Sequence, residues 1–378
     1  MRKFLSVFVP SNIRTAFILA LQILMVLSIA TRHPVVLALF VLCTGALILF
    51  EHNKIEFSQR YKSLAIFTMV SAAAVLPLNV FINPNVVFHF TILAGCLFSG
   101  FYAARKGIDY AEASKFLLIL FQSYIFIYLY YKGTGTQPLE DIVKDSSSNG
   151  ITSYLVCLQI NYSIAMMVIH RKVSIITSIL TLWICIIGYG RGSIIAAAGI
   201  MLLNISFFAF STKLLSVRIA IVLGSVVFVL YAAQNFGIIY DYVYSNTKIG
   251  SGLYDQERSI IIASYLERID GLNLLTGVDI RGGIIDRFYN GNPHNSYIRA
   301  HMIFGLSYIV AIAVALIMAL QKLPDFTTKA YCALAATMLL FRAATEPILF
   351  PTPFDFIFYA LIALMMFANP TDVKSAKQ

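Results

Sequence analysis

Long apolar runs separated by short polar connectors limit how this chain can fold more than any other feature. An apolar helix needs roughly 20 residues to cross the hydrocarbon core of a membrane, and the runs are of about this length. Hydropathy predicts twelve of them, at residues 13–31, 34–50, 64–81, 87–104, 116–131, 151–169, 173–188, 193–210, 219–233, 297–319, 330–348 and 354–367. An even number of crossings predicts that both ends of the chain lie on one side of the membrane.

The composition agrees with a membrane protein. Hydrophobic residues make up 59% of the chain and charged residues 12%, values far from those of a soluble domain. The ten-residue alternation of a membrane β-barrel is not visible, so helices must satisfy the backbone hydrogen bonds. The sequence therefore predicts an all-α polytopic membrane protein with about 12 transmembrane helices. Residues 1–378 are expected to form a single integral membrane domain.

The lysines and arginines predict the orientation of this domain. With the N-terminus in the cytoplasm, most of the 28 Lys and Arg residues fall in or beside the cytoplasmic connectors, as is typical of membrane proteins. Both termini are therefore expected in the cytoplasm. The net charge of +10 is interpreted as membrane anchoring, and no nucleic-acid partner is expected.

The charges predicted on the outer side are mostly arginines, and they gather in the second half of the chain. The longest outer connector covers residues 234–296. Within it, residues 256–269 have apolar side chains at helical spacing, which predicts an amphipathic helix on the outer membrane surface. A connector of this length in a compact protein is commonly functional.

Two outer arginines are the first candidates for a binding site. Arg191 lies in "GYGRGS" between two apolar runs, and Arg258 lies on the predicted amphipathic helix. The planar guanidinium fork suits phosphate, so a diphosphate at the outer surface is the matching ligand. Two plainer interpretations stay open: Arg191 extends to lipid headgroups, or Arg258 pairs with an acidic neighbour such as Glu257.

Three further arginines are secondary candidates. Arg281 and Arg287 flank the flexible "GGIID" and are either phosphate or sugar ligands or solvated loop charges. Arg342 and Glu346 are four residues apart near an outer helix end, where they can form a structural or a catalytic pair.

The stretch "NPHNSYIRAHMIFGLSY" is the candidate for acid–base chemistry. Pro293 suits the start of a helix, so His294 and Asn295 are expected in its first turn and His301 two turns deeper. His294 at the outer lip could act as a general base, or it could merely cap the helix. His301 is expected to be a packed core histidine. All five cysteines lie in apolar runs without a CxxC pair, so neither a disulfide framework nor a metal site is expected.

Three of these stretches together resemble the O-antigen ligase and O-antigen polymerase superfamily. "HNSYIRAHMIFGLSY" matches its signature at His294, Asn295, Gly305 and Tyr308. "YGRGS" is similar to the Ser-Arg-Gly element, with Gly190 where Ser is common. "ERSIIIASYLERIDGLNLLTGVD" resembles an Arg-containing amphipathic helix followed by an L-x-G-x-G turn, although Asp279 replaces the last glycine.

The resemblance implies a C-type glycosyltransferase-like fold in a bacterial inner membrane, with the active site facing the periplasm. It implies glycans linked to undecaprenyl diphosphate as donor and acceptor, no metal or nucleotide cofactor, and a chain-length regulator protein as a candidate partner. Arg191 and Arg258 would bind the diphosphate, and His294 would activate or orient the acceptor hydroxyl. The substrate-binding candidates are Asn295, Arg281, Arg287, Tyr308 and Arg342.

Several functions remain open at this point. An O-antigen polymerase is favoured over an O-antigen ligase, which transfers the glycan to lipid A core, because "DSSSNGITSYL" looks like a stretch that recurs in the polymerases. A flippase for lipid-linked oligosaccharides would have charges through the middle of many helices, where this sequence has few. A scaffold protein would need no arginines and histidine gathered at one depth.

Overall fold

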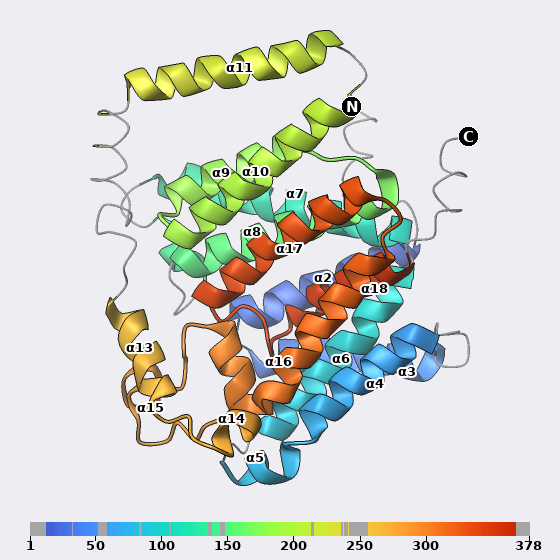
Figure 1. Cartoon of the computed structure of the whole chain (residues 1–378), viewed down its shortest axis with the longest axis vertical. Coiled ribbons are helices and arrows are strands. Elements are labelled where there is room, and N and C mark those ends of the chain that lie inside the picture. The colour runs from blue at the N-terminus through green and yellow to red at the C-terminus, as the bar shows by residue number, and fades with distance from the viewer. Residues whose placement is uncertain are drawn as a thin grey trace.

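The computed structural model describes residues 13–31, 33–51, 59–82, 85–105, 107–134, 138–143, 148–212, 215–235, 237, 241 and 256–367 (Figure 1). These residues form helices joined by turns and irregular segments, without a strand. Seven of the helical stretches are long and apolar enough to cross a membrane. The described part of the chain therefore has the make-up of a multi-pass helical membrane protein. Both chain termini and residues 242–255 of the long connector lie outside the described residues.

Each of the twelve apolar runs overlaps with helical structure over most of its length. The first half of the chain contains α2 (Ile13–Thr31), α3 (Pro34–Glu51), α4 (Gln59–Ala73), α5 (Leu76–Ile82), α6 (Val86–Arg105), α7 (Gly107–Lys132), the short η2 (Glu140–Ile142) and α8 (Ser148–His170). The second half contains α9 (Ile175–Ile187), α10 (Arg191–Ser211), α11 (Leu215–Gln234), α16 (Ser296–Lys322), α17 (Phe326–Thr345) and α18 (Asp355–Phe367). The connector between α11 and α16 contains α13 (Gln256–Leu266), α14 (Asn273–Thr276) and α15 (Ile284–Tyr289).

Not all of these helices are long enough to span a membrane alone. The run at residues 64–81 is divided into α4 and α5. Helices α9 and α18 have 13 residues each, and a helix of that length covers only about 20 Å of a hydrocarbon core roughly 30 Å thick. Twelve membrane crossings therefore stay a prediction, while seven helical stretches have the required length and apolarity.

Helix α18 lies in the core of the packed helices. Its side chains from Asp355 to Met365 are all buried, and it packs against α6, α8 and α16. At Gly100 in α6, a Cβ would lie 2.8 Å from the backbone N of Ala360, so glycine lets the two helices touch. Because α18 is apolar on every side, it suits a position enclosed by protein.

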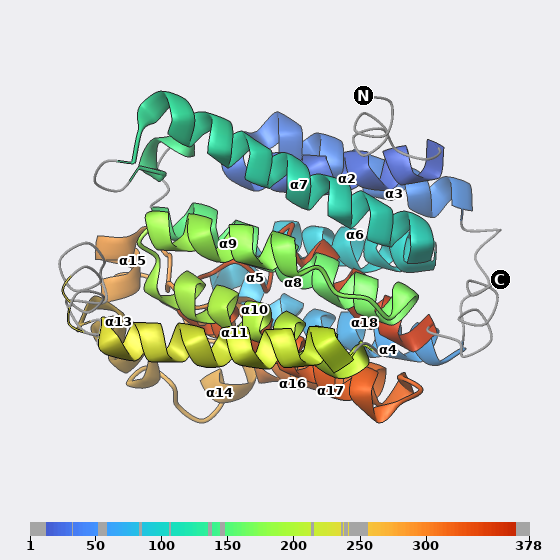
Figure 2. The same cartoon turned by 90° about the horizontal axis from the view of Figure 1, so that it is seen from above.

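The two ends of the helix bundle differ in what they carry. At one end, Arg171 Nη1 lies 3.0 Å from Asp325 Oδ2, which joins the α8–α9 connector to the α16–α17 connector. The other end carries the starts of α10 and α16 and the helices α13, α14 and α15; we call it the loop end. Helices α13 and α15 stand at the left in both views (Figures 1 and 2). These two connectors are both among those that the charge pattern assigns to the cytoplasm, and they lie together at the end of the bundle away from α13.

Between α17 and α18, residues 346–354 return into the bundle without forming a helix; we call them the re-entrant segment. Leu349, Phe350 and Phe354 are fully buried in it, and Ile348 and Thr352 are nearly so. Irregular backbone at membrane depth requires partners for its polar groups. The carboxylate of Asp355 accepts hydrogen bonds from the backbone N of Phe350 at 2.8 Å and of Thr352 at 3.2 Å, and Ser296 Oγ accepts one from Leu349 N at 3.1 Å.

A second irregular element joins the long connector to α16. Helix α16 is kinked at Gly305, where φ is 70°. A Cβ at Gly305 would lie 2.0 Å from a backbone oxygen of α14, and a Cβ at Gly277 would lie 2.3 Å from a backbone oxygen of α16. Asn79 in α5 donates to the carbonyl oxygens of Thr276 and Ile303 at 2.7 and 2.9 Å. The two glycines and Asn79 thus hold α14 against the kink.

Candidate functional site

Two arginines and a carboxylate lie together at the loop end. Arg258 in α13 places Nη2 2.8 Å from Glu346 Oε1, with the two side chains 29% and 12% exposed. The charge of Glu346 also acts on Arg342, in the last turn of α17, whose side chain is fully buried. We call Arg258, Arg342 and Glu346 the arginine cluster. It has one positive charge more than negative, so it can bind an anion.

Hydrogen bonds to hydroxyl groups hold Arg342 in place. Its guanidinium donates to Ser153 Oγ of α8 and to Thr345 Oγ1. The expected pairing of Arg342 with Glu346 along one helix is not formed. Helix α17 ends at Thr345 and Glu346 has an extended conformation, so its carboxylate reaches Arg258 instead.

Two glycines bring the start of α10 against this cluster. A Cβ at Gly192 would lie 2.5 Å from Nη1 of Arg342, so the guanidinium rests on the backbone next to Arg191. Gly190 is covered by two polar side chains of α8, each with an atom 2.7 Å from the position of a Cβ. The glycines of "GYGRGS" therefore let α8, α10 and α17 meet around Arg342, and they place the Arg191 backbone beside the cluster.

The start of α16 is tied to the chain around Glu346. Asn295 is the N-cap of α16, and its side-chain oxygen accepts from two backbone N–H groups of the first turn at 2.8 and 3.1 Å. The amide of Asn295 donates to the carbonyl oxygen of Ala344 at 2.8 Å. Ser296 Oγ donates to the carbonyl oxygen of Glu346 at 2.8 Å. His294 directly precedes Asn295 in the chain, so these bonds also fix the position of the His294 backbone relative to the arginine cluster.

His294 lies just outside α16, contrary to the expectation that it belongs to the first turn. The helix begins at Ser296, and His294 has a left-handed φ of 49°. Its backbone N donates to Asn292 Oδ1 at 3.0 Å, and its ring meets the ring of Tyr289 edge-on with 5.9 Å between centroids. Among the described residues, no hydrogen bond or ion pair joins the His294 ring to an arginine. The structure thus connects His294 to the cluster through the backbone of α16.

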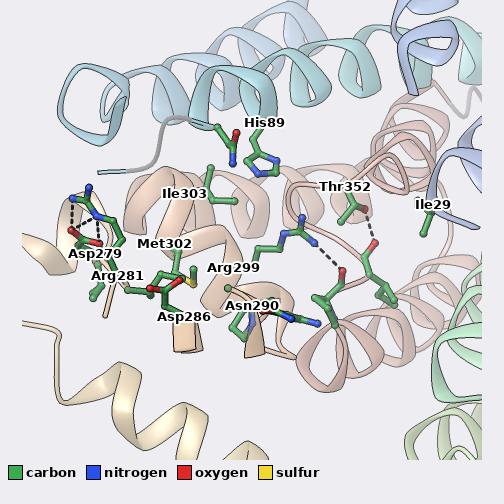
Figure 3. Close-up of a pocket in the computed structure, with 18 of the residues that line it drawn as sticks. Ile29, His89, Asp279, Arg281, Asp286, Asn290, Arg299, Met302, Ile303 and Thr352 are labelled. Atoms are coloured by element: carbon green, nitrogen blue, oxygen red, sulfur yellow. Dashed lines mark hydrogen bonds and ion pairs between the residues drawn. The ribbon is translucent and has the colours of Figure 1, made fainter. Parts of the chain in front are cut away.

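A cavity of about 690 Å³ lies at the loop end beside His294. The residues immediately before it, Asn292 and Pro293, line this cavity, together with residues of α6, α8, α16 and the re-entrant segment. Arg299 of α16 extends into the cavity, and His89 of α6 faces the same space from another wall (Figure 3). A cavity of this volume has the size of a small-molecule binding site.

Arg299 is the central positive charge of this cavity. Its Nη1 lies 3.4 Å from the carbonyl oxygen of Pro347, a long hydrogen bond. The charge of Asp355 acts on Arg299, but the Asp355 oxygens already accept hydrogen bonds from the re-entrant segment. Within the described chain, Arg299 has no ion pair, and a cation so weakly compensated in an apolar helix is typical of a functional site.

The rim of the cavity carries further charges. Arg281 forms a forked pair with Asp279, with Nη2 2.6 Å from Oδ2, and this hydrogen bonding holds the pKa of Asp279 below its usual range. Asp286 accepts a hydrogen bond from the backbone N of Gly282 at 2.8 Å. Arg281, Asp279 and Asp286 all line the cavity, whereas Arg287, on the same connector, is exposed and lies outside its wall.

Two motif residues lie inside the protein. Tyr308, a substrate-binding candidate by resemblance, is buried beyond the kink of α16, and its Oη lies 3.0 Å from that of Tyr359 in α18. His301 is a packed histidine, as predicted. Its Nε2 donates to the carbonyl oxygen of Leu274 at 2.7 Å, which leaves Nδ1 to accept from the Tyr265 hydroxyl at 2.6 Å.

Sequence reasoning gave no role to Arg299 or to His89. Both lie near the loop end of predicted apolar runs, and an ionisable residue inside such a run is itself a signal of function. The sequence contains that signal for both residues. It does not show that α6 and α16, which are far apart along the chain, face the same cavity.

Comparisons of the chain with models of protein families, with curated proteins and with solved structures found no match. Across the described residues, no group of three or more His, Cys, Asp or Glu side chains is placed to hold a metal ion.

Proposed function

We propose that this protein is a glycosyltransferase at the periplasmic face of the bacterial inner membrane. It would polymerise oligosaccharide repeat units linked to undecaprenyl diphosphate into O-antigen or capsular polysaccharide. The observation that carries this proposal is the arginine cluster beside a cavity of about 690 Å³, at one end of a bundle of apolar helices. A lipid-linked glycan matches each of these features. Its lipid chain lies beside apolar helices, its diphosphate pairs with cations at the membrane surface, and its sugars fit a polar cavity.

Arginines suit the donor diphosphate. Arg258 and the neighbouring Arg191 supply planar forks of donors that keep their charge at all physiological pH values, and the buried Arg342 adds its positive charge beside them. A diphosphate carries more negative charge than one carboxylate, so it can compete with Glu346 for Arg258. The resemblance of "YGRGS" and of the amphipathic helix to elements of the O-antigen polymerases supports the same assignment.

The proposed reaction is a displacement at the anomeric carbon of the donor sugar. The acceptor hydroxyl oxygen forms a bond to this carbon, and the bond from the carbon to the diphosphate oxygen breaks, with the electron pair leaving on undecaprenyl diphosphate. The arginines stabilise the charge that develops on the leaving group. His294 takes the hydroxyl proton as general base, a contribution of about 10²- to 10⁴-fold.

The test uses purified protein in lipid nanodiscs supplied with lipid-linked repeat units alone. Wild-type protein is expected to form a ladder of products on a glycan gel. His294→Ala and Arg258→Ala should each slow ladder formation by about 10²-fold or more. Lys322→Ala, at the opposite end of α16, removes a charge without touching the site and serves as the control.

Two results would contradict the proposal in different ways. If no ladder forms but a product appears once lipid A core is added, the protein is an O-antigen ligase. If the ladder forms equally in wild type and in both site variants, the transferase site lies elsewhere in the chain.

A further inference from the structure

The loop-end cavity contains a positive charge that the protein itself neutralises poorly. Among the residues that the structure describes, Arg299 has one hydrogen bond, of 3.4 Å to a backbone carbonyl, and the oxygens of Asp355 are engaged by two backbone N–H groups. An arginine fork with free donor positions pairs best with a planar or tetrahedral oxyanion. The cavity therefore favours a ligand that brings a negative charge to Arg299.

The rest of the wall suits hydroxyl groups. Asp286, Asn290 and Asn292 provide carboxylate and amide groups, which donate to or accept from sugar hydroxyls. The Nδ1 atom of His89 is buried and has no hydrogen-bond partner within the described chain, so it too can bind a ligand atom. Figure 3 shows Asp286 and Asn290 on one side of Arg299 and His89 on another. A ring with several hydroxyls could contact these walls at once.

We propose that the cavity binds a sugar that carries an oxyanion, either a carboxylate or a phosphate. The oxyanion pairs with Arg299, and the ring hydroxyls contact Asp286 and Asn290. This inference rests on the proposed function for the ligand being part of a glycan, and it names the class of that glycan: a repeat unit with an acidic residue. The sugar site is separate from the arginine cluster, which receives the diphosphate.

The size and position of the cavity agree with this assignment. Its volume of about 690 Å³ can hold more than one sugar ring, since cavities of roughly 300–1,000 Å³ bind molecules of drug size. Asn292 and Pro293 line it directly before His294. A sugar bound on Arg299 would therefore extend toward the residue that is proposed to activate a hydroxyl.

The experiment measures binding directly, without the polymerisation reaction. Wild-type protein in nanodiscs is titrated with four probes: glucuronate, glucose 6-phosphate, glucose and glycerol phosphate. At least one acidic sugar should bind at least tenfold more tightly than glucose, because glucose lacks the anion, and tenfold more tightly than glycerol phosphate, because a headgroup-like anion lacks the ring.

Variants locate the binding. Arg299→Gln should remove the preference for the acidic sugar. Lys322→Gln, at the far end of the same helix, and Arg258→Gln, in the arginine cluster, should keep it. Asp286→Asn, on the exposed rim, should weaken acidic sugar and glucose alike, and it provides a second readout if Arg299→Gln does not fold.

Three outcomes would overturn the inference: glucose binding as tightly as both acidic sugars, glycerol phosphate binding as tightly as they do, or a preference lost in Arg258→Gln and kept in Arg299→Gln. The proposed function can fail independently. Absence of a product ladder together with selective binding of an acidic sugar would reject polymerisation and leave the sugar site standing.

Discussion

At the scale of single residues, Gly305 fixes the path of the chain around the site. Its φ of 70° is left-handed, and a Cβ there would lie 2.0 Å from a carbonyl oxygen of α14. We expect Gly305→Ala to destabilise the protein strongly, because the conformation alone costs about 1–3 kcal/mol for a residue with a side chain and the clash adds to it. Thermal unfolding in detergent measures the effect.

The matched control is Gly224→Ala in α11, where a Cβ would meet nothing within 4 Å. This substitution should leave the unfolding temperature unchanged or slightly raised, since alanine favours helix. Equal unfolding temperatures for both variants would show that α14 does not rest in the kink of α16.

The arginine cluster gives a second prediction at this scale. Glu346→Gln removes the negative charge 2.8 Å from Arg258 and leaves Arg342 and Arg258 facing each other without it. We expect a loss of about 1–3 kcal/mol in the free energy of unfolding, and a partial recovery at high salt, because salt screens like charges. Glu257→Gln, next to Arg258 on the exposed face of α13, should have little effect on stability at any salt concentration.

Residue roles could be predicted only where local sequence determines them. Helix starts depend on near neighbours, and the start of α16 was predicted to within three residues. The cap itself was predicted wrongly: the sequence offered His294 as a capping residue and placed Asn295 in the first turn, whereas Asn295 is the N-cap. The partner of Glu346 could not be predicted, because Arg258 lies 88 residues away along the chain. The role of Arg299 could not be predicted either, because other walls of its cavity come from residues far away along the chain, such as His89.

At the scale of elements, α13 is attached to the bundle by a hydrogen bond that depends on pH. Tyr265 is buried, and burial raises the pKa of its hydroxyl. Because the folded-state pKa is raised, the folded state favours the neutral hydroxyl, which is the form that donates to His301. The resulting stability is fully present below the ordinary tyrosine pKa of about 10 and is lost as pH rises from there through the raised value. Hydrogen exchange at α13, followed from pH 7 to 11, should therefore accelerate above about pH 10 more than elsewhere in the bundle.

Tyr265→Phe tests the same bond at neutral pH. It leaves Nδ1 of His301 without its partner, which costs about 1–3 kcal/mol for a buried polar atom, so α13 should exchange faster already at pH 7. The extra acceleration above pH 10 should disappear in this variant. If wild type and Tyr265→Phe respond identically to pH, another group controls the docking of α13.

The sequence predicted the helices better than their interruptions. Hydropathy found the twelve apolar runs because each is long and carries few charges, and the amphipathic pattern at residues 256–269 corresponds to a helix at Gln256–Leu266. It did not reveal the break between α4 and α5, the kink at Gly305 or the irregular residues 346–354. These interruptions are largely apolar as well, and contacts with distant residues help to hold them: Asn79 bonds to both sides of the kink region, and Ser296 accepts from the backbone of residues 346–354.

At the scale of the whole molecule, the two ends of the bundle should face opposite sides of the membrane. Four of the five cysteines are buried, so single exposed cysteines can report sidedness to a membrane-impermeant maleimide. We expect Leu272→Cys, at the exposed loop end, to react in cells with a permeabilised outer membrane. Lys322→Cys, at the opposite end, should react only after the inner membrane is opened. Reaction of both before opening, or of Lys322→Cys alone, would reject the orientation predicted from the charges.

The re-entrant segment has a consequence for mapping this protein with reporters. Because its residues are buried and bonded to Asp355 and Ser296, an epitope or enzyme inserted between α17 and α18 would have to displace core side chains. Such a fusion would report misassembly and degradation whichever side of the membrane it was meant to mark. A connector that looks like an ordinary hairpin in a hydropathy plot is thus unsuitable for tagging, and the exposed turn before α14 is the better insertion point.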